Sequence, residues 1–192
     1  MSAIIFKYGT MGSTKSLSLM TTAFNMDERS VPSLTIKPEI DTRDGENQIY
    51  SRIGISRPCL TFSPDENLYE LVKSQENINE LKWIFVDEAQ FLTEEQVDQL
   101  SDVVDIFDIN VMCYGLRTDF KSKLFPGSKR LFERADTIEE IKSTCNCGNK
   151  TIINARVDKD GNVMSNGPQT LVGGDDRYVS MCRKCWKKKR QK

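Results

Sequence analysis

Four short apolar runs in the first two thirds of the chain predict buried strands. They cover residues 3–8, 33–37, 83–86 and 109–114. The third run, Trp-Ile-Phe-Val, contains no polar residue, which is typical of a strand whose two faces are both covered. Strands of this kind belong to parallel sheets rather than to half-solvated antiparallel ones. We therefore expect a parallel sheet.

Two segments between these runs carry the apolar spacing of helices. The first covers residues 16–26, and the second follows Thr93-Glu94-Glu95-Gln96, which has the form of a capping box. The apolar residues of the second segment recur at intervals of three and four, as on one buried helical face: Val97, Leu100, Val104 and Phe107. Helices that alternate with strands predict an α/β fold with helices on both faces of the sheet.

The pattern changes near residue 143. From there the chain has clustered cysteines, a turn at residues 158–162, and short strand-like segments at 151–157 and 178–181. We expect two domains, residues 1–142 and a smaller one at 143–192.

The charge balance bears on the partners of the protein. Twenty-seven basic and 28 acidic side chains give a net charge of −1, whereas a general nucleic-acid binder carries a basic excess. The one basic run, residues 187–190, is interpreted as a solvated terminus. The sequence shows no signal peptide and no apolar run of membrane-spanning length, so we expect a cytoplasmic protein without nucleic-acid or membrane partners.

Histidine is absent, and this restricts the chemistry. A Ser-His-Asp triad, a Cys-His pair and a His-ligated metal are all excluded. A general base must then be a carboxylate or, less favourably, Lys, Tyr or Cys.

The segment between the first strand and the first helix approaches a phosphate-binding P-loop, which is Gly, four residues, Gly, Lys and Ser or Thr. It consists of Gly9, Thr10, Met11, Gly12, Ser13, Thr14, Lys15 and Ser16. Backbone N–H groups at a helix N-terminus would face the phosphates, with Lys15 reaching the β- and γ-phosphates and Ser16 ligating Mg²⁺. Thr14 stands where the pattern has its second glycine. The alternative is a helix N-terminus with a coincidental Gly and Lys-Ser.

Two acidic residues, Asp87 and Glu88, follow the third predicted strand. An Asp at the end of a buried strand beside a P-loop commonly holds Mg²⁺. Glu88 would face a substrate hydroxyl and is the best candidate for general base, because histidine is missing. The alternative is that both acids only cap the loop before the next helix.

Four of the six cysteines form two close pairs: Cys145 with Cys147, and Cys182 with Cys185. Two such pairs indicate a tetrahedral, closed and therefore structural Cys₄ zinc site. A disulfide framework is the alternative, less suited to the expected compartment. Cys59 and Cys113 lack paired spacing and are interpreted as buried small hydrophobic residues.

Together these segments resemble the type II thymidine kinase family over residues 4–186. The most specific piece is Asp-Glu-Ala-Gln-Phe at 87–91, the family's acidic motif, whose Glu is the general base. The other matching stretches are residues 37–38, 41–43, 51–54, 115–120, 125–128 and 173–178. The resemblance implies a P-loop NTPase-type sheet and a zinc-binding lasso domain that closes over the nucleoside.

The resemblance also implies the reaction and its ligands: an ATP-dependent thymidine kinase with Mg²⁺ and structural Zn²⁺. Residues 9–16 would hold the nucleotide, together with Asp87, Glu88, Ala89 and Gln90. The nucleoside would contact Met11, Asp41, Arg43, Leu116, Phe120, Leu171, Gly173 and Tyr178. The family is usually tetrameric and inhibited by thymidine triphosphate, so a homotetramer with dTTP feedback is expected. Asn154 falls where the family varies and receives no role.

Two other functions stay open at this point. Because Thr14 replaces the loop glycine, the chain could be a catalytically weakened relative that binds nucleotides as a sensor or decoy. A nucleic-acid-binding module built on the cysteine-rich part and the basic tail is the third hypothesis, and the near-neutral net charge argues against it.

Overall fold

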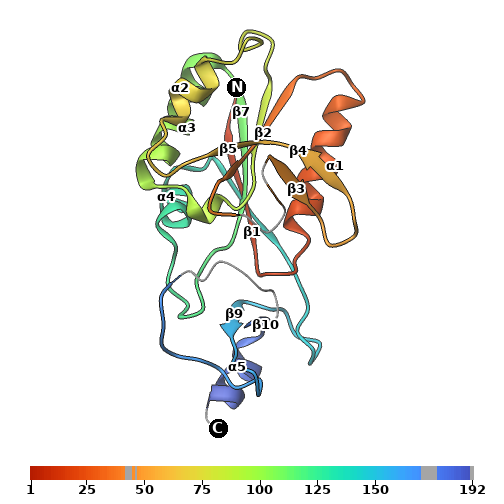
Figure 1. Ribbon diagram of the computed structural model, residues 1–192, viewed down its shortest axis with the longest axis vertical. Helices are drawn as coiled ribbons and strands as arrows, with labels where there is room; N and C mark the ends of the chain where they lie inside the picture. The colour runs from red at the N-terminus through yellow and green to blue at the C-terminus, as the bar shows by residue number, and fades with distance from the viewer. Residues whose placement is uncertain (42–44, 46, 170–176, 191–192) are drawn as a thin grey trace.

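The computed structural model describes residues 1–41, 45, 47–169 and 177–190. Its centre is a six-stranded sheet with the order β5-β2-β6-β7-β1-β8 (Figure 1). The strands of this sheet are β1 (Ile4–Gly9), β2 (Ser33–Pro38), β5 (Leu60–Phe62), β6 (Trp83–Val86), β7 (Asn110–Gly115) and β8 (Thr137–Ile141). Each neighbouring pair is parallel, which confirms the sheet expected from the apolar runs.

Helices cover both faces of the sheet, as predicted (Figure 1). One face carries α2 (Leu68–Lys73), α3 (Glu94–Phe107) and α4 (Pro126–Arg134). The other face carries α1 (Lys15–Asp27) and the antiparallel hairpin of β3 (Gln48–Tyr50) and β4 (Ser56–Pro58). A short 3₁₀ turn, η1 (Ala89–Phe91), links β6 to α3.

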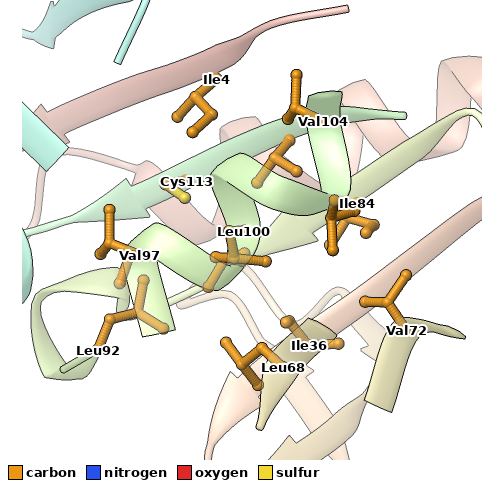
Figure 2. Packing of buried hydrophobic residues seen from close by; sticks show 14 of the residues in the cluster. Ile4, Ile36, Leu68, Val72, Ile84, Leu92, Val97, Leu100, Val104 and Cys113 are labelled. Atoms are coloured by element: carbon orange, nitrogen blue, oxygen red, sulfur yellow. The ribbon is translucent and has the colours of Figure 1, made fainter. Parts of the chain in front are cut away.

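Alternate residues of the central strands point to opposite faces, so the sheet has two apolar cores. In β6, Ile84 and Val86 pack in the cluster under α2, α3 and α4, whereas Phe85 packs with α1. Figure 2 shows the first cluster, in which Leu100 and Val104 of α3 lie over the sheet. This two-sided burial explains why the β6 run contains no polar residue.

The four apolar runs match β1, β2, β6 and β7 within about one residue at each end. The two edge strands were not predicted. β5 has only three residues, and β8 has the sequence Thr-Ile-Glu-Glu-Ile with two acids on an exposed edge. An edge strand lacks the double burial that produces a continuous apolar run, so the pattern does not mark it.

The predicted capping box at the start of α3 is present. The Thr93 hydroxyl accepts a hydrogen bond from the Gln96 N–H at 3.1 Å, and the Gln96 side chain accepts one from the Thr93 N–H at 3.1 Å. The amide of Gln96 also donates to the carbonyls of Ser63 and Glu66. These bonds fix the helix N-terminus against the loop before α2.

The predicted helix at 16–26 corresponds to α1 (Lys15–Asp27). Leu19, Met20 and Ala23 are buried, whereas Phe24 is 57% exposed. None of the described helices has both the length and the apolar character that crossing a bilayer requires.

The remaining described residues, 143–169 and 177–190, form what we call the C-terminal lobe (Figure 1). Strands β9 (Ile153–Arg156) and β10 (Tyr178–Met181) pair antiparallel, and α5 (Arg183–Arg190) follows. Six buried residues make its small core: Cys145, Ile153, Ala155, Val157, Met181 and Cys182. The basic run at 187–190 is exposed, as expected, but it is helical.

Candidate active site

The predicted phosphate loop follows the carboxyl end of β1, which lies between β7 and β8 in the sheet, and it leads into α1. Gly9 has no room for a side chain, because a Cβ there would come within 2.3 Å of the Ser13 hydroxyl oxygen. Lys15 is buried, and its ammonium group donates to the Thr10 carbonyl at 2.9 Å. The lysine is therefore folded over the loop to which it belongs.

Thr14 occupies the backbone conformation that a glycine favours. It caps α1 with φ 63° and ψ 25°, in the left-handed region, and its hydroxyl donates to the Ser13 carbonyl at 2.6 Å. A left-handed residue with a side chain is destabilised by about 1–2 kcal/mol relative to glycine. The loop backbone thus keeps the left-handed conformation that a glycine would adopt at this position, and the threonine is strained as a result.

The two acids after β6 stand next to this loop. Asp87 is buried and forms a hydrogen bond with the Ser16 side chain, so both predicted Mg²⁺ ligands are neighbours. Burial, helped by the nearby Glu88 carboxylate, raises the pKa of Asp87 to about 7, against the opposing effects of Ser16 and Lys15. A carboxylate and a hydroxyl at a helix N-terminus are the hard oxygen ligands that Mg²⁺ prefers.

Glu88 is held by its own backbone and by Gln90. Its φ of 48° lies in the left-handed region, and its N–H donates to the Asp87 carboxylate at 3.0 Å. The Gln90 amide donates a short hydrogen bond to the Glu88 carboxylate and accepts one from the Leu116 N–H at 2.8 Å. Gly115 makes this possible, because a Cβ there would lie 2.9 Å from the Gln90 amide oxygen. Gln90 therefore connects the acidic motif to the end of β7.

The turn after β7 brings two further predicted residues to the same end of the sheet. The Leu116 carbonyl accepts from the Ser128 hydroxyl of α4 at 2.5 Å. Phe120 is buried, and the guanidinium of Arg156 lies 3.8 Å above its ring centroid. The same guanidinium donates to the hydroxyl of Tyr178. Phe120 and Tyr178 are therefore brought together around one arginine of β9.

The hairpin of the C-terminal lobe contacts the phosphate loop directly. The N–H of Met11 donates to the Asn154 side chain at 2.8 Å, and the carbonyl of Met11 accepts from the Ser180 hydroxyl at 2.6 Å. Asn154 and Ser180 are cross-strand partners in β9 and β10, so one residue pair of the hairpin binds both the backbone N–H and the backbone carbonyl of Met11. A further bond of 2.8 Å joins the hydroxyls of Thr10 and Thr151.

Asn154 is a residue that the sequence analysis left without a role. It is buried, and its amide also donates to the Thr118 carbonyl at 3.3 Å. The one signal in the sequence was an amide inside the apolar stretch 152–155, because a buried polar side chain needs partners. Of the other predicted nucleoside contacts, Asp41 is buried, while Arg43, Leu171 and Gly173 lie outside the described residues.

The four paired cysteines come together in the C-terminal lobe. Their sulfur atoms all lie within 4.8 Å of one another, and all six cysteines of the chain are free thiols. The sulfurs of Cys147 and Cys182 are 3.5 Å apart, far beyond a disulfide bond but close to the edge of a tetrahedral Zn–S₄ site. Hydrogen bonds from Asn149 lower the pKa of Cys147 to about 6, which favours the thiolate that a metal binds. This arrangement fits zinc, and none of the four cysteines is in a disulfide.

The two unpaired cysteines are buried, as expected. Burial raises the pKa of the Cys113 thiol to about 12, so this side chain is an unreactive part of the core.

Comparison of the sequence with known proteins identifies its relatives. The family model described as thymidine kinase matches residues 2–186. A thymidine kinase of Rhodopirellula baltica is 46% identical over 95% of this chain and 87% of its own length. Those of Enterobacteria phage T4 and Mannheimia succiniciproducens are 46% and 44% identical, over 97% and 98% of this chain and 96% and 97% of their own lengths. A match of this length and identity shows that the chain belongs to the thymidine kinase family.

Proposed function

We propose that this protein transfers the γ-phosphoryl group of ATP to the 5′-hydroxyl of thymidine and that Glu88 is the general base. The observation that carries the proposal is the meeting of three elements at one end of the sheet. The phosphate loop, the Asp87–Glu88 pair and the turn that contains Phe120 all follow parallel strands, and they are joined by the Ser16–Asp87 and Gln90–Leu116 hydrogen bonds.

The phosphate loop binds the triphosphate in this proposal. Lys15, which contacts the Thr10 carbonyl in the structure, turns its ammonium group to the β- and γ-phosphates. The Met11 N–H is engaged by Asn154, so the donors toward phosphate come from the later loop positions at the N-terminus of α1. Ser16 and Asp87 would hold Mg²⁺, which when bound neutralises charge on the transferred phosphoryl group.

Glu88 accepts the proton of the 5′-hydroxyl as that oxygen attacks. The absence of histidine leaves carboxylates as the natural bases, and Gln90 holds this one in place by donating to it. Asp87 is the less suitable base because it is buried and bonded to Ser16.

Met11, Leu116, Phe120 and Tyr178 surround the nucleoside in this proposal, and Asp41 and Arg43 serve the 5′-hydroxyl and phosphate end. Leu171 and Gly173 complete the base site from the lasso. The zinc held by the four cysteines is structural. A homotetramer, feedback inhibition by dTTP and a cytoplasmic location are further parts of the proposal.

The test is the substitution Glu88→Gln, which keeps the shape and removes the base. Turnover is expected to fall by a factor on the order of 10² to 10⁴, while calorimetry shows that thymidine still binds. Glu76→Gln, at an exposed position after α2, is the matched control and should keep full activity. Unchanged turnover of Glu88→Gln would refute the assignment of the base.

A second candidate rests on the left-handed backbone of Thr14: a weakened relative that binds nucleotide but turns over poorly. Thr14→Gly relieves the strain, and we expect it to lower the KM for ATP severalfold in an enzyme that is already active. If the wild type is inert with thymidine and Thr14→Gly restores transfer, the weakened relative is the correct description.

A further inference from the structure

One peptide unit of the phosphate loop is held on both of its sides. The carbonyl of Thr10 accepts the Lys15 ammonium group at 2.9 Å and the Ser13 N–H at 3.2 Å. The N–H of the same peptide unit belongs to Met11 and donates to the Asn154 side chain at 2.8 Å. Because a peptide unit is planar, its N–H and its carbonyl point in opposite directions and turn together. The bond to Asn154 therefore fixes the direction of the carbonyl that receives the lysine.

The side chain of Thr10 is also held by the C-terminal lobe. Its hydroxyl lies 2.8 Å from the hydroxyl of Thr151, and both residues are buried. The Thr151 hydroxyl donates its single proton to the Ser143 carbonyl at 3.2 Å, so the Thr10 hydroxyl is the donor of the threonine pair. The N–H of Thr151 donates to the same Ser143 carbonyl at 2.9 Å, which holds this acceptor in place.

The position of the Lys15 ammonium group depends on the acceptors around it, because a buried charge must be hydrogen-bonded. An ammonium group has three N–H donors, so Lys15 can keep the Thr10 carbonyl while it donates to phosphate oxygens. A turn of the Thr10–Met11 peptide unit would remove this carbonyl from the lysine. The two bonds from the lobe, to the Met11 N–H and to the Thr10 hydroxyl, oppose such a turn.

We propose that Thr151 and Asn154 are positioning residues that fix the Thr10–Met11 peptide unit, and through it the ammonium group of Lys15, for the phosphates of the bound nucleotide. This inference rests on the proposed function, in which Lys15 binds the β- and γ-phosphates. It adds a dependence that the loop motif does not contain. The position of the lysine is set by two side chains that lie 141 and 143 residues from their partners in the loop and act without touching the nucleotide.

Thr151→Val tests the threonine pair, since it leaves the Thr10 hydroxyl without its acceptor. Calorimetry with inorganic tripolyphosphate as the probe should show binding weakened on the order of tenfold, and the KM for ATP should rise in parallel. The dissociation constant for thymidine and the zinc content should not change. Asn154→Ala should weaken tripolyphosphate binding by a similar factor. Thr151→Ser keeps the hydroxyl and should bind like the wild type, as should the matched control Thr137→Val at an exposed position of β8.

Lys15→Met shows whether the effect of Thr151 passes through the lysine. This substitution alone should weaken tripolyphosphate binding more than Thr151→Val does. Thr151→Val added to Lys15→Met should cause little further loss, because both act through one ammonium group. Full additivity of the two losses would place the effect of Thr151 elsewhere and would overturn the inference.

Two other results would also contradict it. One is tripolyphosphate binding by Thr151→Val equal to that of the wild type. The other is an equal loss of thymidine and tripolyphosphate binding together with loss of zinc, which a purely structural role of Thr151 predicts. If Thr151→Val does not fold, Thr10→Val removes the other half of the pair and decides in the same measurements.

The proposed function fails separately. Wild-type protein that binds tripolyphosphate but does not phosphorylate thymidine would refute the proposed function. The binding measurements on Thr151→Val and Thr151→Ser would still decide whether the lobe positions the phosphate loop.

Discussion

The parallel sheet and the C-terminal lobe are stabilised in different ways. The sheet has an apolar core on each face, built from residues of β1, β6 and β7 with the helices that cover them. The lobe has a core of six buried residues, two of which are cysteines of the four-sulfur cluster. A region of that size buries too little apolar surface to offset its conformational entropy without a metal or a large neighbour. This difference predicts that metal removal unfolds the lobe and not the sheet, and that a cavity in the apolar core destabilises the sheet without loss of the metal from the lobe.

Removal of the zinc that the four cysteines are proposed to hold is expected to have the largest effect, with loss of structure confined to the lobe. Chelation or Cys147→Ser should abolish thymidine phosphorylation, because the hairpin that holds Met11 and Tyr178 loses its support. Hydrogen exchange should show loss of protection at residues 143–169 with β1, β6 and β7 still protected.

Cys113→Ser is the control for this experiment. It places a hydroxyl in the core of the sheet and should lower stability by about 1–3 kcal/mol with the bound zinc unchanged. Joint loss of protection in both regions after chelation would show that the two are one cooperative unit.

A cavity in the sheet core should have the reverse effect. Leu100 is 1% exposed and packs between α3 and the sheet (Figure 2), so Leu100→Ala should lower the free energy of unfolding by about 2–5 kcal/mol. The measurement is denaturant unfolding, with zinc content determined on the folded protein. Ile106→Ala, on the same helix at a position that is 62% exposed, should be nearly neutral. A loss of zinc in Leu100→Ala would contradict the separation of the two regions.

The smallest effect is expected where the two regions meet. Asn154→Ala leaves the Met11 N–H without its partner and loosens the phosphate loop, so the KM for ATP should rise on the order of tenfold. The zinc content and the unfolding of the sheet should not change. Asn162→Ala in the exposed turn is the matched control and should resemble the wild type. Equal ATP affinity in Asn154→Ala would show that the hairpin does not support the loop.

Much of the fold could be predicted because it depends on local periodicity. The central strands and α3 each repeat one burial pattern, and the capping box is a short-range signal between Thr93 and Gln96. The edge strands β5 and β8 could not be found in this way. They are strands because a neighbour presents hydrogen-bonding groups to them, and not because their own residues alternate.

The candidate site shows the same division. Ser16, Asp87 and the cysteine pairs could be proposed from the sequence because each motif indicates its chemistry within a few residues. The partners of Met11 could not, because Asn154 and Ser180 lie 143 and 169 residues away in the chain. No short pattern records a contact over that distance.

The sequence by itself determined the parallel α/β sheet and the two cysteine pairs suited to zinc, and it predicted a phosphate loop with an unusual Thr14 and an acidic pair after the third strand. Only the tertiary structure decided that Thr14 takes the left-handed conformation of a glycine, that the hairpin of the lobe grips Met11, and that Arg156 lies buried against Phe120 and Tyr178. The physical reason is that periodicity and motif spacing act between near neighbours. The register of β9 and β10 and the docking of the lobe bring together groups from distant parts of the chain.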